Sequence, residues 1–176
     1  MFLLGKSKIH DVLSYVFTYI NGNIPNRVKN IIYHNQHICN SYKIPFKIFF
    51  FELQQGECAA GKSDWLRLER ACRDSRIMYV DWDCLIKKFP KFDPKIPMMG
   101  PGFWNNEKQI DLWSFYNGDK LDLFNLILKA SIPKKGQYAS YADFLTCSGI
   151  KKEFKTFTSS ELKHLNLAQG RIVKIL

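Results

Sequence analysis

The sequence has no apolar run long enough to cross a membrane. A transmembrane helix needs about 20 consecutive apolar residues, and the longest candidate, residues 12–20, is shorter and contains polar side chains. The first residues also lack the apolar stretch of a secretory signal peptide. We therefore expect a cytoplasmic protein without a transmembrane segment.

Cysteine pairs with the spacing of a metal site are missing as well. The chain has five cysteines, an odd number, and none stands in a C-x-x-C pair. This argues against a zinc site or a disulfide framework and fits a reducing compartment. Internal repeats and low-complexity tracts are also absent. A chain of 176 residues that is 46% hydrophobic then predicts one globular domain, residues 1–176.

Acidic residues are concentrated in one segment. The net charge is +10, yet residues 51–83 hold seven acidic residues against five basic ones. Residues 84–176 hold fifteen basic and eight acidic residues. A basic surface attracts anions such as nucleotides or acidic polymers. A solvated surface without a specific partner is the alternative.

Strands alternate with helices in the first half of the chain. Apolar runs, turn residues and helical spacing predict strand 13–20, helix 26–42, strand 46–51, helix 63–73 and strand 77–80. This order favours an α/β domain with a mostly parallel central sheet, in which ligands bind at the carboxyl ends of the strands. Two such ends, residues 19–21 and 81–83, carry polar side chains.

The second half is less regular. Four prolines and two glycines within residues 87–102 predict a long loop or extended arm. We expect this basic arm to lie beside residues 81–83, where its lysines would bind an acidic partner. These lysines are Lys87, Lys88, Lys91 and Lys95. Further on, the pattern predicts strand 110–116, helix 121–130 and short helices at 141–144 and 159–167.

Two short motifs carry chemistry. In the helix predicted to start at Ser63, Asp64 and Arg67 are three residues apart and share a face. Asp81 and Asp83 follow the strand 77–80 and point the same way because they are two residues apart. Two carboxylates there suit a hard divalent cation. Each motif alone is also typical of a surface ion pair or a turn, but their order and spacing together are more specific.

The sequence resembles the DXD-containing sugar-binding region of GT-A-type glycosyltransferases. The resemblance lies in AAGKSDWLRL at 59–68 and MYVDWD at 78–83, and FTYING at 17–22 is similar to the family's first strand. That region occurs in bacterial and fungal polysaccharide enzymes and in the glucosylating domains of large clostridial toxins. The resemblance implies a nucleotide-diphospho-sugar transferase fold, with a nucleotide-sugar-binding half at 13–83 and an acceptor-side half at 84–176.

The resemblance also implies an activity and roles for the matching residues. The enzyme would transfer a sugar from a nucleotide-sugar, expected to be a UDP-sugar, to an unidentified acceptor such as an anionic saccharide, protein or nucleic acid. Asp81 and Asp83 would hold Mn²⁺ or Mg²⁺ on the diphosphate. Asp64 would bind the donor sugar or ribose, Arg67 would pair with sugar hydroxyls or phosphate, and Tyr19 would stack on the base. Candidates for a further metal ligand are Ser160, His164 and Asn166.

A rival motif overlaps the first. Residues 56–63 match the phosphate-binding loop pattern G-x-x-x-x-G-K-[ST] in full, and Asp81 would then be the aspartate that follows a second strand. Against this, Gln54 and Gln55 separate the strand from Gly56, and an acid at Asp64 is unfavourable near phosphates. A nucleoside-triphosphate-binding protein thus remains an alternative. So does a catalytically inactive glycosyltransferase-like fold that serves as a basic binding module.

Overall fold

The computed structural model describes residues 9–104, 107–131, 150–156 and 165–167. A six-stranded sheet forms its centre, in the order β2-β1-β3-β6-β5-β7. Its strands are β1 (Tyr15–Asn21), β2 (Phe46–Phe51), β3 (Ile77–Val80), β5 (Met98–Trp104), β6 (Glu107–Tyr116) and β7 (Lys155–Thr156). The described residues contain no helix of the length and apolarity that a membrane span requires.

The sheet changes direction halfway across. β1 pairs in parallel with β2 and with β3, as the β-α-β-α-β order predicts. β6 then pairs antiparallel with both β3 and β5, while β7 runs parallel to β5. The prediction of a parallel sheet is therefore confirmed for the first half, and the second half adds an antiparallel hairpin.

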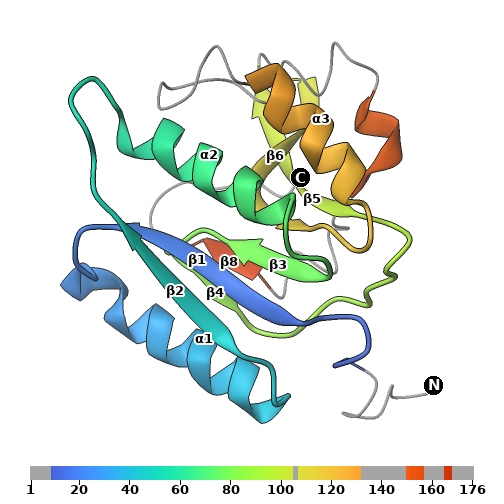
Figure 1. The fold of residues 1–176 in the computed structure, drawn as a ribbon. Coiled ribbons are helices and arrows are strands. Elements are labelled where there is room, and N and C mark those ends of the chain that lie inside the picture. The colour runs from blue at the N-terminus through green and yellow to red at the C-terminus, as the bar shows by residue number, and fades with distance from the viewer. Residues whose placement is uncertain (1–8, 105–106, 132–149, 157–164, 168–176) are drawn as a thin grey trace.

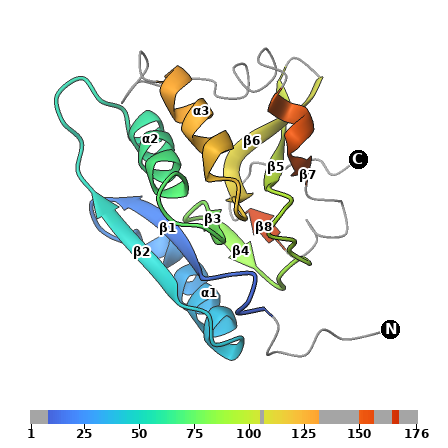
Figure 2. The ribbon, with the colours of Figure 1, turned by 45° about the vertical axis from the view of Figure 1, so that its right-hand side comes forward.

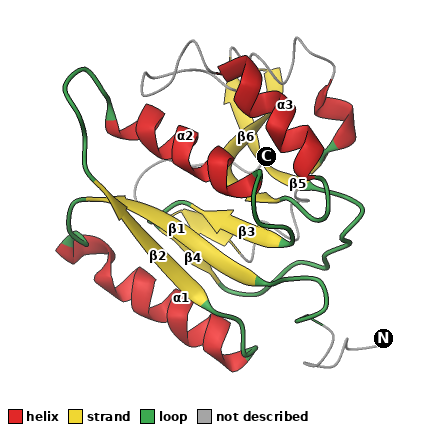
Figure 3. Cartoon of the chain, viewed as in Figure 1, coloured by secondary structure: helices red, strands yellow, loops and turns green. Residues whose placement is uncertain are grey.

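Helices cover both faces of the sheet (Figures 1 and 2). The 3₁₀ turn η2 (Asn26–Val28) leads into α1 (Lys29–Ser41) on one face, and α2 (Ala59–Ala71) and α3 (Leu121–Ser131) lie on the other. Figure 3 also shows the short strand β4 (Cys84–Ile86), which pairs antiparallel with β8 (Leu165–Leu167) outside the main sheet. A 3₁₀ turn, η4 (Ile150–Glu153), precedes β7.

Aromatic rings fill the core between the sheet and α2. Phe17, fully buried on β1, lies within 6.1 Å, ring centre to ring centre, of five other rings. These five are Tyr15, Tyr19, Phe49, Tyr79 and Phe115. Alternate β1 residues such as Val16 pack on the opposite face, in the core beneath α1. Burial on both faces explains why β1 and β3 have no charged residues.

Several predicted boundaries were wrong. The second helix begins at Ala59, because the Sγ of Cys58, and not Ser63, caps it by accepting from the Gly61 amide at 3.3 Å. The segment predicted as a loop to residue 102 contains the start of β5. Residues 165–167 form a strand where a helix was expected, and the predicted helix at 141–144 lies outside the described residues.

Candidate functional site

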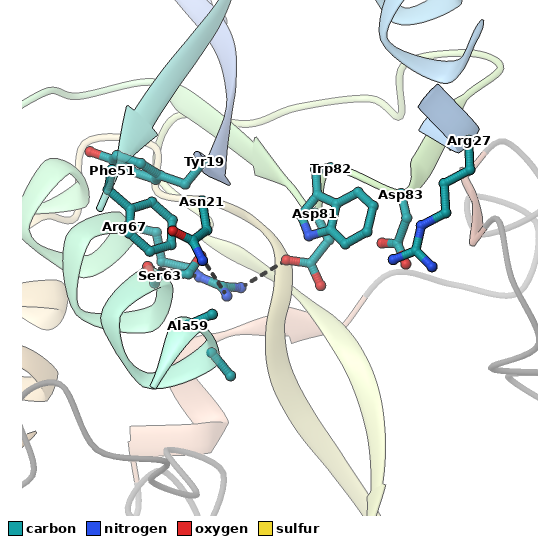
Figure 4. A pocket seen from close by; sticks show the side chains of 11 residues that line it. Tyr19, Asn21, Arg27, Phe51, Ala59, Ser63, Arg67, Asp81, Trp82 and Asp83 are labelled. Atoms are coloured by element: carbon teal, nitrogen blue, oxygen red, sulfur yellow. Dashed lines mark hydrogen bonds and ion pairs between the residues drawn. The ribbon is translucent and has the colours of Figure 1, made fainter. Parts of the chain in front are cut away.

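A pocket of about 370 Å³ opens at the carboxyl ends of the parallel strands (Figure 4). This is the edge where a sheet of this kind binds ligands. The lining comes from the ends of β1 and β2, from η2, from α2 and from the residues after β3. Its members are Tyr19, Asn21, Arg27, Phe51, Ala59, Ala60, Ser63, Arg67, Asp81, Trp82 and Asp83.

Arg67 connects the two predicted motifs. Its Nη2 lies 2.6 Å from Oδ1 of Asp64, and its Nη1 lies 3.2 Å from Oδ1 of Asp81. Nη1 also donates to the backbone carbonyl of Leu112 on β6 at 2.7 Å. Only 5% of Arg67 is exposed, and a buried guanidinium must be paired in this way to be tolerated. The structure therefore brings Asp64, Arg67 and Asp81 together.

Tyr79 contacts both Asp81 and Arg67 of this cluster. Its hydroxyl donates to Oδ1 of Asp81 at 2.8 Å, and the guanidinium of Arg67 lies 4.3 Å from the centre of its ring. Complete burial raises the pKa of Tyr79 well above 10.0, against the opposing effect of the Arg67 charge. The hydroxyl hence keeps its proton and stays a donor. Asp81 is thus oriented by two side chains that are themselves fixed in the core.

Trp82 and Asp83 complete the aspartate motif at the other side of the pocket. Figure 4 shows Asp81 on the side of Arg67 and Asp83 on the side of Arg27. The guanidinium of Arg27, carried by η2, lies 5.3 Å from the centre of the Trp82 ring. Both aspartates line the pocket.

The carboxylates of Asp81 and Asp83 match the oxygen ligands that Mg²⁺ or Mn²⁺ prefers. No group of three or more His, Cys, Asp or Glu side chains gathers into a metal cluster within the described ranges. Two carboxylates fit a cation that is bound jointly with substrate phosphates. Of the further candidate ligands, Ser160 and His164 lie outside the described residues, and the structure describes only the backbone of Asn166.

Tyr19 lines the pocket but is largely enclosed. It is 5% exposed, and its ring lies 5.4 Å from that of Phe49 and 6.3 Å from that of Phe51. Its hydroxyl accepts from Nε of Arg70 at 3.1 Å. The ring therefore forms a wall of the pocket.

Sequence reasoning missed several of the lining residues. Phe51 pairs with Asn21 at the ends of neighbouring parallel strands, and it could have been found by applying the strand-end rule to β2 as well. Arg27 could not be identified from the sequence around it, because η2 lies beside the pocket only in the folded chain.

The phosphate-binding-loop motif does not form a loop of the usual kind. Gly61, Lys62 and Ser63 all lie inside α2. Nζ of Lys62 lies 2.7 Å from Oε1 of Glu57. In the sheet, β1 lies between β2, the strand before the motif, and β3, the strand before Asp81, so these two strands are not neighbours.

The predicted basic arm does not lie beside the aspartate motif. Phe89, within this segment, packs its ring 5.2 Å from that of Tyr42, which follows the last residue of α1. In Figure 1, β1, β2 and β3 end at the left, whereas the chain between β4 and β5 runs along the right. The expected position was therefore wrong, because β4 carries the chain back along α1.

The fold is shared with a glycosyltransferase of known structure. No family model and no curated protein matches the sequence. Among solved structures, a glycosyltransferase involved in glycosylation of the major capsid of PBCV-1 aligns with a TM-score of 0.57 and 11% identity, over 85% of this chain and 87% of that one. A Drosophila β-1,4-galactosyltransferase 7 mutant in complex with manganese, UDP-Gal and xylobiose aligns with a TM-score of 0.49 and 8% identity. That alignment covers 92% of this chain and 74% of the other. The chain therefore has a mixed α/β fold like that of the PBCV-1 glycosyltransferase.

Proposed function

We propose that this protein is a metal-dependent glycosyltransferase that uses a nucleotide-sugar donor, with a UDP-sugar as the expected class. The observation that carries the proposal is the pair Arg67 and Asp81, which lines a pocket at the carboxyl edge of the sheet and is linked through the Arg67 guanidinium to Asp64. The fold that the chain shares with the PBCV-1 glycosyltransferase supports it. Residues 13–83 would bind the donor, and residues 84–176 would complete the acceptor side.

Asp81 and Asp83 would hold Mn²⁺ or Mg²⁺ against the diphosphate of the donor. When bound, the ion offsets the negative charge that develops on the leaving nucleoside diphosphate. Arg67 keeps the Asp81 carboxylate in place for this task, since it binds Oδ1 together with Tyr79. Preorganised charges of this kind need no rearrangement during the reaction.

Asp64 and the aromatic side chains would hold the rest of the donor. The Asp64 carboxylate, fixed by Arg67, would accept hydrogen bonds from hydroxyls of the sugar or ribose. Tyr19 and Phe51 line the side of the pocket formed by β1 and β2 and would contact the nucleotide base. An apolar aromatic wall with a few fixed polar groups is a common form of nucleotide pocket.

The test measures thermal stability with UDP-, GDP- and ADP-sugars and with ATP, each with Mn²⁺ and with EDTA. We expect a UDP-sugar to raise the melting temperature only when Mn²⁺ is present, because a ligand bound only to the folded state stabilises that state. Stabilisation by ATP alone would support a triphosphate-binding protein. No response to any nucleotide would support the inactive binding module.

A further inference from the structure

A basic surface lies at the end of the sheet opposite the pocket. It is formed by residues 87–97, here called the basic arm, between β4 and β5. Phe89 and Phe92, each 7% exposed, anchor the arm. Their rings lie 5.2 Å from Tyr42, next to the end of α1, and 4.3 Å from Tyr116, at the end of β6. The arm is thus held against the fold at two points.

The lysines of the arm point into solvent. On either side of the two buried phenylalanines, the lysine side chains remain exposed. The exposed lysines are Lys87, Lys88, Lys91 and Lys95, together with Lys43, which follows Tyr42. None of their ammonium groups forms an ion pair within the described part of the chain. The arm has a single acidic residue, Asp93, whose Oδ1 accepts from the Lys95 backbone amide at 2.9 Å.

An apolar side chain accompanies these charges. Ile96, next to Lys95, is 43% exposed and is one of the few large exposed hydrophobic residues in the described structure. Cationic side chains around an exposed apolar one suit the interface of an anionic bilayer, where the lysines meet headgroups and the apolar group enters the acyl boundary. Nucleic-acid binding would favour exposed aromatic rings for base stacking, and those of the arm are buried.

We propose that the basic arm, with Lys43 and Ile96, docks the protein onto an anionic membrane surface. A lysine near such a surface strengthens binding by about fivefold, so five of them suffice for reversible docking without a membrane span. The donor pocket lies at the carboxyl ends of β1 and β3 and the arm near their amino ends. A docked molecule therefore holds its pocket away from the lipid. The proposal is independent of the donor chemistry.

The test is co-sedimentation with vesicles made of equal parts phosphatidylcholine and phosphatidylserine, compared with phosphatidylcholine alone. The wild-type protein is expected to bind only the anionic vesicles, and added salt is expected to weaken the binding. The variant carrying Lys88→Glu and Lys91→Glu should bind about twenty-five-fold more weakly or worse. Ile96→Ser should weaken binding several-fold while the salt dependence stays the same.

A matched control carries Lys29→Glu and Lys129→Glu, two exposed lysines on α1 and α3, and has the same net charge. Its affinity for the anionic vesicles should fall by less than about threefold, because only long-range attraction is reduced. Circular dichroism and melting temperature confirm that each variant is folded. Equal losses in both double variants, or no binding of wild-type protein to anionic vesicles, would overturn the proposal. Binding of single-stranded DNA that depends on Lys88 and Lys91, without vesicle binding, would overturn it in favour of a nucleic-acid surface.

Discussion

Nη1 of Arg67 lies 3.2 Å from Oδ1 of Asp81, although the two residues belong to different elements, α2 and the end of β3. The same guanidinium holds Asp64 at 2.6 Å. Each carboxylate is therefore placed relative to the other by one buried cation. This arrangement gives the site a rigid core, and it makes Arg67 as important for the fold as for the proposed activity.

Arg67→Ala should lower the free energy of unfolding by about 2–4 kcal/mol, because removing one partner of a buried pair leaves the others unpaired. We place the value below that of a fully buried pair, because the side chains of Asp64 and Asp81 are 16% and 24% exposed. Urea unfolding measures the effect. Arg73→Ala, on a less buried arginine just beyond α2, is the control and should change little. A loss below about 0.5 kcal/mol in Arg67→Ala would contradict the structural role.

Tyr79→Phe removes only the hydroxyl that donates to Asp81. We expect a loss of about 1–2 kcal/mol in stability, as for one hydrogen bond to a charged group. Since the hydroxyl orients a proposed metal ligand, binding of Mn²⁺ with UDP should weaken by about tenfold. Isothermal titration calorimetry measures that affinity.

The control for this variant is Tyr116→Phe. The Tyr116 hydroxyl also donates within the fold, to the carbonyl of Val12, far from the pocket. The control should lose stability but keep the Mn²⁺ affinity of the wild-type protein. Equal affinities in both variants would mean that Tyr79 serves packing alone.

Asp81→Asn and Asp83→Asn should both lower activity. Losing a carboxylate on the metal costs about 3–4 kcal/mol in the transition state, or a few hundredfold in turnover, by analogy with other preorganised charge-stabilising groups. Asp81→Asn should also lower the melting temperature, because Asp81 accepts from both Arg67 and Tyr79. Mn²⁺-dependent hydrolysis of a UDP-sugar and melting temperature are measured on the same samples. Full activity in both variants would end the metal-site proposal.

Lys62→Ala distinguishes the proposed binding of a nucleotide-sugar from the alternative of a triphosphate-binding protein. In a phosphate-binding loop this lysine contacts the β- and γ-phosphates, and its removal nearly abolishes binding. Here its ammonium pairs with Glu57, and Lys62 is not among the residues that line the pocket. Binding of a UDP-sugar, measured by calorimetry, should therefore stay within about twofold of the wild-type value. Loss of ATP binding in this variant would revive the triphosphate-binding alternative.

Stability should fall in alkaline solution between about pH 10 and pH 12. Burial and then the hydrogen bond to Asp74 raise the pKa of Tyr15 from 10.0 to about 12. In that range the unfolded chain loses the phenolic proton while the folded chain keeps it, so rising pH favours the unfolded state. Urea unfolding across this range measures the loss. Tyr15→Phe should make the fall smaller without abolishing it, because burial also raises the pKa of Tyr79 and of Cys39. A profile identical to that of the wild-type protein would contradict the contribution of Tyr15.

Continuous apolar runs explain which strands could be predicted. β2 and β3 were located at 46–51 and 77–80 because their apolar residues stand between turn residues. β5 was missed because its two glycines and its proline are typical of loops. The structure gives another reason for Gly100, since a Cβ there would lie 2.5 Å from the indole of Trp113. A glycine required by packing against a distant residue cannot be distinguished in sequence from one required by a turn.

The candidate site was predicted only where it depends on short-range spacing. Asp64 and Arg67 are one helical turn apart, so their contact follows from the helix alone. The bond from Arg67 to the carbonyl of Leu112 spans 45 residues. It exists only because β6 pairs antiparallel with β3. That pairing depends on the second half of the chain, for which periodicity gave little information.

The bond between Arg67 and Leu112 has a consequence for fragments of this protein. The residues that resemble the sugar-binding region end at residue 83, but the acceptor of their central arginine is a backbone carbonyl from β6. A polypeptide cut in the basic arm would separate the guanidinium from that carbonyl and leave one edge of β3 unpaired. The two pieces would have to reassociate before this contact formed again. The segment defined by similarity is therefore not an autonomous module that could be grafted onto another protein.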